Sequence, residues 1–219
     1  MANLIIFGAG DIARLACHYF KVDSEHKVSA FTVDPEYLRE TTLLGLPVVE
    51  FSEALSHYPP TAFQMFVALS YTKMNQVRAE KFHAMKRLGY RLVSYVSSRC
   101  TWLTDHPIGD NCMILEDNTI QPFVKIGDNV ILWSGNHVGH DSVIEDHCFI
   151  TSHVVISGRV RVGAYSFLGV NSTLRDGIRI APRTLVGGGA VIMKDTIESG
   201  VYVANRATKL SRSSNLISP

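Results

Sequence analysis

A repeat with a period of six residues dominates the second half of the chain. From residue 108 to residue 192, every sixth residue is Ile, Leu or Val without exception. Helical faces recur about every 3.6 residues and strand faces every second residue, so a fixed period of six fits neither a helix nor a flat strand. It predicts short strands, each of which points one aliphatic side chain inward before the chain turns a corner. The fifteen positions are Ile108, Ile114, Ile120, Ile126, Leu132, Val138, Ile144, Ile150, Ile156, Val162, Leu168, Leu174, Ile180, Val186 and Ile192.

Three such strands make one triangular coil of eighteen residues, and the fifteen repeats supply about five coils. Small or β-branched residues follow four places after the aliphatic positions, among them Ser142, Cys148, Val154, Ser166 and Thr184. Stacked coils bury these columns and pair their backbones, which predicts a parallel β-helix. Repeat geometry alone also permits a scaffold that only holds neighbouring domains apart.

The length of the chain favours two domains. It has 219 residues, and the repeat begins only after residue 100. We expect a Rossmann-like α/β domain with a small parallel sheet over residues 1–98, the β-helix over residues 99–198, and a C-terminal cap or tail over residues 199–219.

The charge balance argues against polyanionic partners. The formal net charge is +1, and Lys86 with Arg87 is the longest basic run. A nucleic-acid surface or an anchor on an anionic membrane therefore has little support, and a small-molecule partner is expected.

Cysteine usage and hydropathy favour a cytoplasmic location. Cys17, Cys100, Cys112 and Cys148 stand far apart with no CxxC pair, so neither a zinc knuckle nor a disulfide framework is indicated. No stretch approaches eighteen apolar residues, and no signal-peptide pattern opens the sequence.

The first residues read as a strand, a glycine turn and a helix. The apolar run of residues 4–7 precedes Gly8 and Gly10, where Gly8 allows a sharp turn and Gly10 lets a backbone approach a ligand. Free N–H groups at the start of the helix can hold phosphate oxygens. Asp11 would repel a pyrophosphate there, and it is interpreted as the N-cap of the helix rather than as a ligand contact.

Three further strands and one helix are expected before the repeat. We predict strands at 27–33, 63–69 and 91–95 and a helix at 75–88. About four parallel strands amount to half of a dinucleotide fold, which suits one nucleotide moiety, and a nucleotide sugar fits better than a nicotinamide cofactor. The candidate substrate-binding residues are Gly8, Gly10, Asp34 at the end of the second strand, and Ser70 and Tyr71 after the third; Asp34, Ser70 and Tyr71 can equally be ordinary loop residues.

Four histidines fall within seventeen residues of the repeat, and none occupies an aliphatic position. His137, His140, His147 and His153 are therefore expected on or near the outer surface. Asp141 directly follows His140 and can hold one ring tautomer, so His140 is the candidate general base. The alternatives are ordinary surface histidines or a zinc site shared between subunits.

These motifs carry a family resemblance. The chain resembles the sugar acyltransferases of the left-handed β-helix superfamily, in particular the nucleotide-amino-sugar N-acetyltransferases and the so-called sialic acid O-acetyltransferases. The most specific segments are the His140–Asp141 pair within 138–144, the run at 167–172, and the glycines at 186–191 with Lys194 behind them.

The resemblance implies a left-handed prism in a homotrimer, with acetyl-coenzyme A between adjacent prisms and no metal. It makes His140 the base and Asp141 the acidic partner of its ring, and it assigns the nucleotide of the sugar to the N-terminal domain. Many relatives place a second histidine where this chain has Phe149, so that role is absent or moves to His153. The candidate coenzyme-binding residues are His153, Gly158, Gly169, Asn171, Gly187, Gly188 and Lys194.

The expected function is acetyl-CoA-dependent N-acetylation of a nucleotide-linked amino sugar, a 3- or 4-amino dideoxy sugar, for surface polysaccharide or glycan synthesis. The alternatives are O-acetylation of a sugar hydroxyl on the same fold, a non-catalytic nucleotide-sugar sensor or scaffold, and a metal-dependent prism enzyme. The sequence does not choose the nucleotide base, the sugar position or the acyl group.

Overall fold

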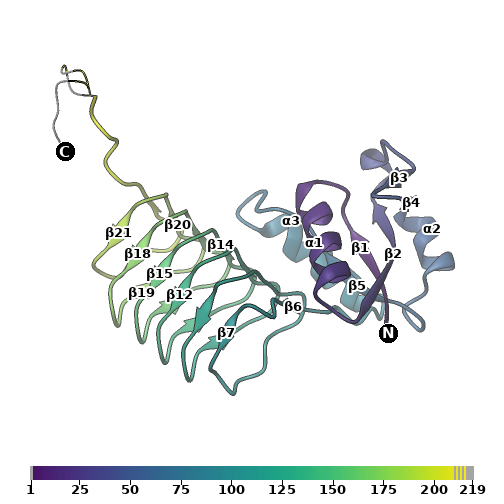
Figure 1. Cartoon of the computed structure of the whole chain (residues 1–219), viewed down its shortest axis with the longest axis horizontal. Coiled ribbons are helices and arrows are strands. Elements are labelled where there is room, and N and C mark those ends of the chain that lie inside the picture. The colour runs from purple at the N-terminus through teal and green to yellow at the C-terminus, as the bar shows by residue number, and fades with distance from the viewer. Residues whose placement is uncertain (1, 210, 212, 214, 216–219) are drawn as a thin grey trace.

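The chain forms an α/β unit that stands beside the first coils of a triangular prism (Figure 1). The computed structural model describes residues 2–209, 211, 213 and 215. The expected tail at 199–219 therefore lies partly outside the described residues. Within the described part, no helix is both long enough and apolar enough to cross a membrane.

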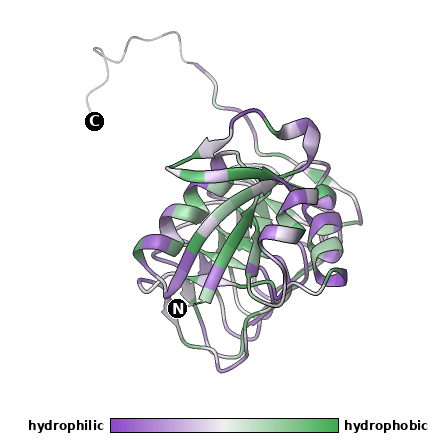
Figure 2. Ribbon diagram, turned by 90° about the vertical axis from the view of Figure 1, so that its right-hand side faces the viewer, coloured by the Kyte–Doolittle hydropathy of each residue, from purple (hydrophilic) through white to green (hydrophobic). Residues whose placement is uncertain are grey.

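The N-terminal unit is built on a five-stranded sheet of order β3-β4-β2-β1-β5. Four strands run parallel, and β3 pairs antiparallel with β4. Both faces of the sheet are covered, so the run Leu4–Phe7 of β1 is buried and apolar, and Figure 2 shows hydrophobic stretches along the strands of this sheet. The strands are β1 (Ala2–Phe7), β2 (His26–Val33), β3 (Thr42–Leu43), β4 (Leu46–Glu50) and β5 (Gln64–Val67).

The helices cover opposite faces of this sheet. Helix α1 (Asp11–Val22) buries Phe20 in one apolar cluster with Leu4 and Ile6. Helix α3 (Gln76–Arg87) buries Phe82 in another cluster with Ile5 and Phe7, which alternate with Leu4 and Ile6 along β1. A short α2 (Phe51–His57) and a 3₁₀ turn (Pro35–Tyr37) complete the unit.

Two sequence expectations in this unit are wrong. The strand expected at 91–95 is an isolated bridge between Leu92 and Met65, and Tyr95 already belongs to the prism. The fourth parallel strand is β4 instead. It was not predicted because it contains Pro47, and proline is rare inside sheets. Asp11 is not an N-cap: Gly10 holds that position, and Asp11 is the first helical residue, with a side chain 94 % exposed.

The prism has three parallel sheets, whose strands pair eighteen residues apart through most of its length. Ile114 pairs with Leu132, and Leu132 pairs with Ile150. The seven-stranded face comprises β6 (Tyr95–Val96), β8 (Met113–Ile114), β11 (Ile131–Leu132), β14 (Phe149–Ile150), β17 (Phe167–Leu168), β20 (Leu185–Val186) and β22 (Val201–Tyr202). The six-stranded face comprises β7 (Thr101–Trp102), β9 (Thr119–Ile120), β12 (His137–Val138), β15 (Val155–Ile156), β18 (Thr173–Leu174) and β21 (Val191–Ile192). The four-stranded face comprises β10 (Lys125–Ile126), β13 (Val143–Ile144), β16 (Arg161–Val162) and β19 (Arg179–Ile180).

The six-residue period works as predicted. From Ile114 to Ile192 the repeated aliphatic residues are at most 7 % exposed, and Ile108 packs against the same core from the end of the prism. Each strand therefore points its second residue inward and its first outward.

The corners carry a second period of six. From 111 to 189 the residue three places before each aliphatic position has a positive φ, and eight of these fourteen corners are Asn, Asp or Gly, the residues that tolerate it best. The corners are Asn111, Asp117, Phe123, Asn129, Gly135, Asp141, His147, His153, Arg159, Tyr165, Asn171, Gly177, Arg183 and Gly189.

The α/β unit covers strands β8, β11, β14 and β17 of the seven-stranded face, whereas Val201 of the last strand is 67 % exposed. Outward side chains of that face, including Met113, Ile131 and Phe149, share one apolar cluster with Leu4 and Phe20 of the sheet and α1. The other two faces of the prism are not covered by this unit.

Candidate functional site

His140 lies at the edge of the prism between the six-stranded and four-stranded faces, two residues beyond β12. Its Nδ1 is 2.8 Å from Oδ2 of Asp141. Asp141 is a corner residue with φ 59°, and this left-handed turn sets its carboxylate beside the preceding imidazole. The two side chains are 45 % and 52 % exposed, so solvent and substrates can reach the pair.

Gly158 lies one coil above His140 and packs directly against its ring. A Cβ at Gly158 would stand 2.6 Å from His140 Nε2 and 2.9 Å from Cε1. Only glycine leaves room for the imidazole in this position. The Gly158 N–H donates no hydrogen bond to another described group.

This arrangement suits proton transfer next to an oxyanion. When Asp141 accepts a hydrogen bond from Nδ1–H, Nε2 keeps its lone pair and can accept a proton from an attacking nucleophile. The free amide of Gly158 beside it can stabilise negative charge on a carbonyl oxygen. The structure thus brings together three of the predicted site residues.

The remaining predicted coenzyme-binding residues do not form one group within the chain. Lys194 belongs to the same column as His140, which continues at intervals of eighteen residues through Gly158 and Asp176. His153 and Asn171 are stacked corners on the other edge of the six-stranded face, between it and the seven-stranded face, and Gly169, Gly187 and Gly188 flank that edge. The predicted residues therefore divide between two edges of one face.

His153 does not lie near the base. Its ring packs over Gly135, where a Cβ would stand 2.5 Å from Cε1. Phe149, the position of the second histidine in many relatives, is 1 % exposed and stacks on Phe167 at 5.8 Å between ring centroids.

The histidines do not share one environment. His137 points outward from the six-stranded face as expected. His147 was expected at the surface, but it is 4 % exposed because the α/β unit covers its corner, where Asn129 lies 3.0 Å from its Nδ1. Burial and the neighbouring His83 lower the pKa of His147 to about 4.

A cavity of about 880 Å³ opens at the carboxyl ends of β1, β2 and β5. Ligands in parallel α/β sheets bind at this end. Gly8, Gly10, Asp34 and Ser70 line it, so four of the five predicted substrate-binding residues lie together. Tyr71 does not line it: its ring packs on Phe149 and Phe167, at 5.1 and 4.9 Å between centroids.

Sequence reasoning missed several cationic residues of this cavity. Lys81 Nζ lies 2.6 Å from Asp34 Oδ1, and Arg14, Arg39 and Lys73 also line the cavity. Lys81 stands one helical turn after Val77, another lining residue, so helical spacing along α3 was the available signal.

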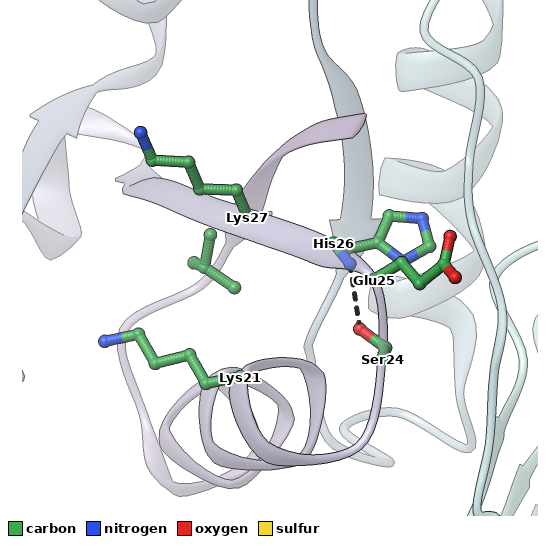
Figure 3. A pocket seen from close by; sticks show the side chains of 6 residues that line it. Lys21, Ser24, Glu25, His26 and Lys27 are labelled. Atoms are coloured by element: carbon green, nitrogen blue, oxygen red, sulfur yellow. Dashed lines mark hydrogen bonds between the residues drawn. The ribbon is translucent and has the colours of Figure 1, made fainter. Parts of the chain in front are cut away.

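A second cavity, of about 600 Å³, lies at the opposite end of the sheet (Figure 3). It is lined by residues before and at the start of β2, including Lys21 and Lys27, and the His26 backbone N–H donates to Ser24 Oγ at 3.2 Å. It adjoins neither the glycine turn nor the prism edge with His140. Among the described residues, no group of three or more His, Cys, Asp and Glu is arranged to hold a metal ion.

The cavity and His140 face different sides of the prism. The α/β unit that carries the cavity packs on the seven-stranded face, whereas His140 lies on the edge opposite that face. A ligand in the cavity therefore does not face the His140 of the same chain.

Comparison with known proteins supports the fold. Residues 108–140 match the family of bacterial transferase hexapeptide repeats. The acetyltransferase domain of PglB from Neisseria gonorrhoeae has a TM-score of 0.80 at 22 % identity, covering 96 % of this chain and all of that chain. PerB from Caulobacter crescentus, in complex with CoA and GDP-perosamine, has a TM-score of 0.81 at 24 % identity, covering 93 % of this chain and 95 % of that chain. The expected hexapeptide-repeat fold, a small α/β unit followed by a left-handed parallel β-helix, is confirmed.

Curated relatives match about half of the chain or less. An acyl-[acyl-carrier-protein]–UDP-N-acetylglucosamine O-acyltransferase of Nautilia profundicola is 28 % identical over 111 residues, 48 % of this chain and 43 % of the relative. The corresponding enzyme of Stutzerimonas stutzeri is 32 % identical over 95 residues, 40 % of this chain and 37 % of the relative. The chain thus spans less than half the length of the curated relatives it matches.

Proposed function

We propose that the protein is an acetyl-CoA-dependent N-acetyltransferase that acts on a nucleotide-linked 3- or 4-amino sugar, in the synthesis of surface polysaccharides or glycans. The proposal depends on the arrangement around His140: its Nδ1 lies within hydrogen-bond distance of Asp141, and its ring packs against Gly158, whose amide is free. The nucleotide-sized cavity of the α/β unit adds a place for the acceptor. A structure of similar fold that holds CoA and GDP-perosamine supports both assignments.

In the proposed reaction, the neutral amine of the sugar attacks the thioester carbonyl of acetyl-CoA. His140 Nε2 removes the proton from the amine, directly or through water, and Asp141 stabilises the imidazolium. The Gly158 N–H donates to the carbonyl oxygen as it becomes negative, and one such donor contributes roughly 3–4 kcal/mol to lowering the barrier. The intermediate then expels coenzyme A as the thiol, which takes up the proton, and leaves the N-acetyl sugar.

We propose a homotrimer because the groups required lie apart in one chain. The nucleotide cavity and His140 occupy opposite sides of the prism. The coenzyme-binding candidates also divide between two edges, His153, Gly169, Asn171, Gly187 and Gly188 on one, and Gly158 and Lys194 on the other. A second copy that brings its opposite edge alongside would complete both sites.

The proposal assigns separate tasks to the regions of the chain. Residues 1–98 bind the nucleotide through Gly8, Gly10, Asp34 and Ser70, with Tyr71 nearer the prism, and residues 99–198 carry the acetyl transfer. Of the cap or tail expected at 199–219, Val201 and Tyr202 pair with the last coil. Both substrates are cytoplasmic metabolites, and we propose a cytoplasmic location on that ground.

The test is thiol release from acetyl-CoA with UDP-, GDP- and dTDP-linked 3-amino and 4-amino sugars, beside their hydroxyl counterparts. Release with one amino sugar, confirmed by a mass gain of one acetyl group, is the expected result. No release with any amino sugar, at a protein concentration that binds acetyl-CoA, would overturn N-acetylation.

The second candidate is O-acylation of a nucleotide sugar. It is favoured by the curated relatives, which are named as O-acyltransferases. Release only with the hydroxyl sugars would establish it. Failure to bind acetyl-CoA at all would point to a nucleotide-sugar sensor or scaffold instead.

A further inference from the structure

A strained turn forms one wall of the nucleotide cavity. Lys73, Met74 and Asn75 are consecutive non-glycine residues with φ of 51°, 51° and 65°. Left-handed backbone is unfavourable for residues with a Cβ, and a run of three persists only where the surroundings impose it. Lys73 lines the cavity, so the strain lies at the proposed substrate site.

Buried contacts with the prism impose this turn. Asn75 is fully buried, and its Nδ2 donates to the carbonyl oxygens of Tyr165 and Ser166 at 3.1 and 3.3 Å. Its Oδ1 accepts a hydrogen bond from Arg78 at 3.2 Å. The turn is therefore fastened to the edge of the prism between the four-stranded and seven-stranded faces.

Arg78 completes the fastening without a carboxylate partner. Its guanidinium is fully buried and donates to the backbone carbonyls of Asn129 at 2.6 Å and of His147 and Cys148 at 3.2 Å. Such an expensive arrangement holds the start of α3 at one place on the prism.

The turn places an available cation in the cavity. Of the basic residues lining it, Arg14 lies 3.8 Å from Asp11 and Lys81 lies 2.6 Å from Asp34. Lys73 and Arg39, which lines the same cavity, form no ion pair with any described residue, and Lys73 is the one of the two that the strained turn carries. The segment that carries Lys73 follows Ala68. A Cβ at Gly8 would stand 2.8 Å from the carbonyl oxygen of Ala68, so this segment begins where the end of β5 packs directly on the glycine turn.

We infer that Lys73 binds the diphosphate of the nucleotide sugar and that Asn75 and Arg78 are positioning residues that hold it there. The inference rests on the proposed nucleotide cavity. The carboxylate of Asp11, at the start of α1, would repel the negative charge of a diphosphate. The ammonium group of Lys73 would attract that charge and so offset the repulsion.

Calorimetric titration with UDP, GDP and dTDP, and with the matching nucleosides, tests the role of Lys73. Lys73→Met should weaken binding of the preferred diphosphate about tenfold or more, since a charge-assisted hydrogen bond is lost, and leave nucleoside binding unchanged. Lys73→Arg should keep most of the affinity. Lys27→Met, in the cavity at the far end of the sheet, is the matched control and should change nothing.

The positioning role is tested by Asn75→Gly, which keeps the positive φ without strain but removes the amide. We expect weaker diphosphate binding and a flatter dependence of the dissociation constant on salt, as in Lys73→Met, because the lysine is present but no longer held. A merely structural role would lower the melting temperature and leave the salt dependence unchanged. The second measurement is hydrogen exchange of the backbone amides of residues 71–76. We expect slow exchange in the unaltered protein and faster exchange in Arg78→Lys.

The outcomes separate the two proposals. Equal diphosphate affinity in Lys73→Met, or no diphosphate binding by the unaltered protein, overturns the inference. Lys73-dependent binding without any acetyl transfer would leave the inference standing and overturn the proposed function.

Discussion

The prism and the α/β unit hold their candidate site residues in different ways. In the prism, register alone stacks His140 under Gly158, because positions eighteen residues apart lie one coil apart. In the α/β unit, the cavity collects residues from β1, β2, α1 and the segment after β5, and a buried arginine with an asparagine holds the wall in place. A repeat therefore gives precision from local sequence, whereas the open sheet obtains it from a few long-range contacts.

The largest expected effect tests the prism side of this contrast. His140→Ala should lower turnover by about 10²- to 10⁴-fold, since the proposed general base is lost, while acetyl-CoA affinity and the melting temperature stay close to their original values. Steady-state thiol release with the identified acceptor measures it. His137→Ala, on the neighbouring strand, is the control, and an equal loss there would remove His140 from its role.

The next effect tests the steric match between two coils. Gly158→Ala should lower turnover by about 100-fold, because its methyl group would displace the imidazole from the reacting geometry. The backbone of Gly158 has no positive φ, so the fold should survive, which thermal denaturation checks. Unchanged turnover would show that the ring position does not matter.

A third prediction concerns the junction of the two regions. The pKa of His147 is about 4 in the folded protein, below its unfolded value of about 6.5, so the unfolded state binds a proton first as the pH falls. Stability is fully present above pH 6.5 and should decrease toward pH 4, by on the order of 1–3 kcal/mol. Urea denaturation across this range measures it.

His147→Asn sharpens this prediction. The corners below His147 in the same column are Asn129 and Asn111, so asparagine suits both the left-handed backbone and the side-chain ladder. The variant should lose that part of the pH dependence. A pH profile identical to that of the unaltered protein would assign the effect to other groups.

The smallest effect is expected in the α/β unit. Gly10→Ala places a methyl group where nothing lies within 4 Å, on an extended backbone, so the free energy of unfolding should change by no more than about 0.5 kcal/mol. Thermal denaturation measures it, with Gly158→Ala as the comparison. A loss of several degrees would mean that Gly10 is needed by the fold itself.

The sequence predicted the prism almost completely, because each position depends only on its neighbours in the repeat. The aliphatic columns and the eighteen-residue coil both followed from counting. The α/β unit was predicted less well: β4 was missed, a strand at 91–95 was wrong, and Lys73 and Lys81 were overlooked. The placement of Lys73 depends on tertiary contacts of the same turn, such as that of Arg78 with Asn129, which leave no periodic signal. His147 was misplaced for the same reason, since the surface that covers it comes from a distant segment.

The eighteen-residue coil also fixes the distances between residues of one column, because each coil adds the same rise along the prism. The column that starts at His140 reaches Lys194 after three coils, a rise of about 14 Å at the usual spacing of neighbouring strands. Extra residues within the strands can be absorbed only in whole coils, because a smaller number would rotate every later column onto another face, and residues added at a corner have to loop out of the prism. An extra coil inserted between the two residues would move Lys194 one strand spacing further from His140 and would leave the cavity of the α/β unit unchanged. The distance between His140 and Lys194 along this edge, where we propose that the coenzyme binds, is therefore set in steps of one strand spacing by the number of repeats and not by the identity of any side chain.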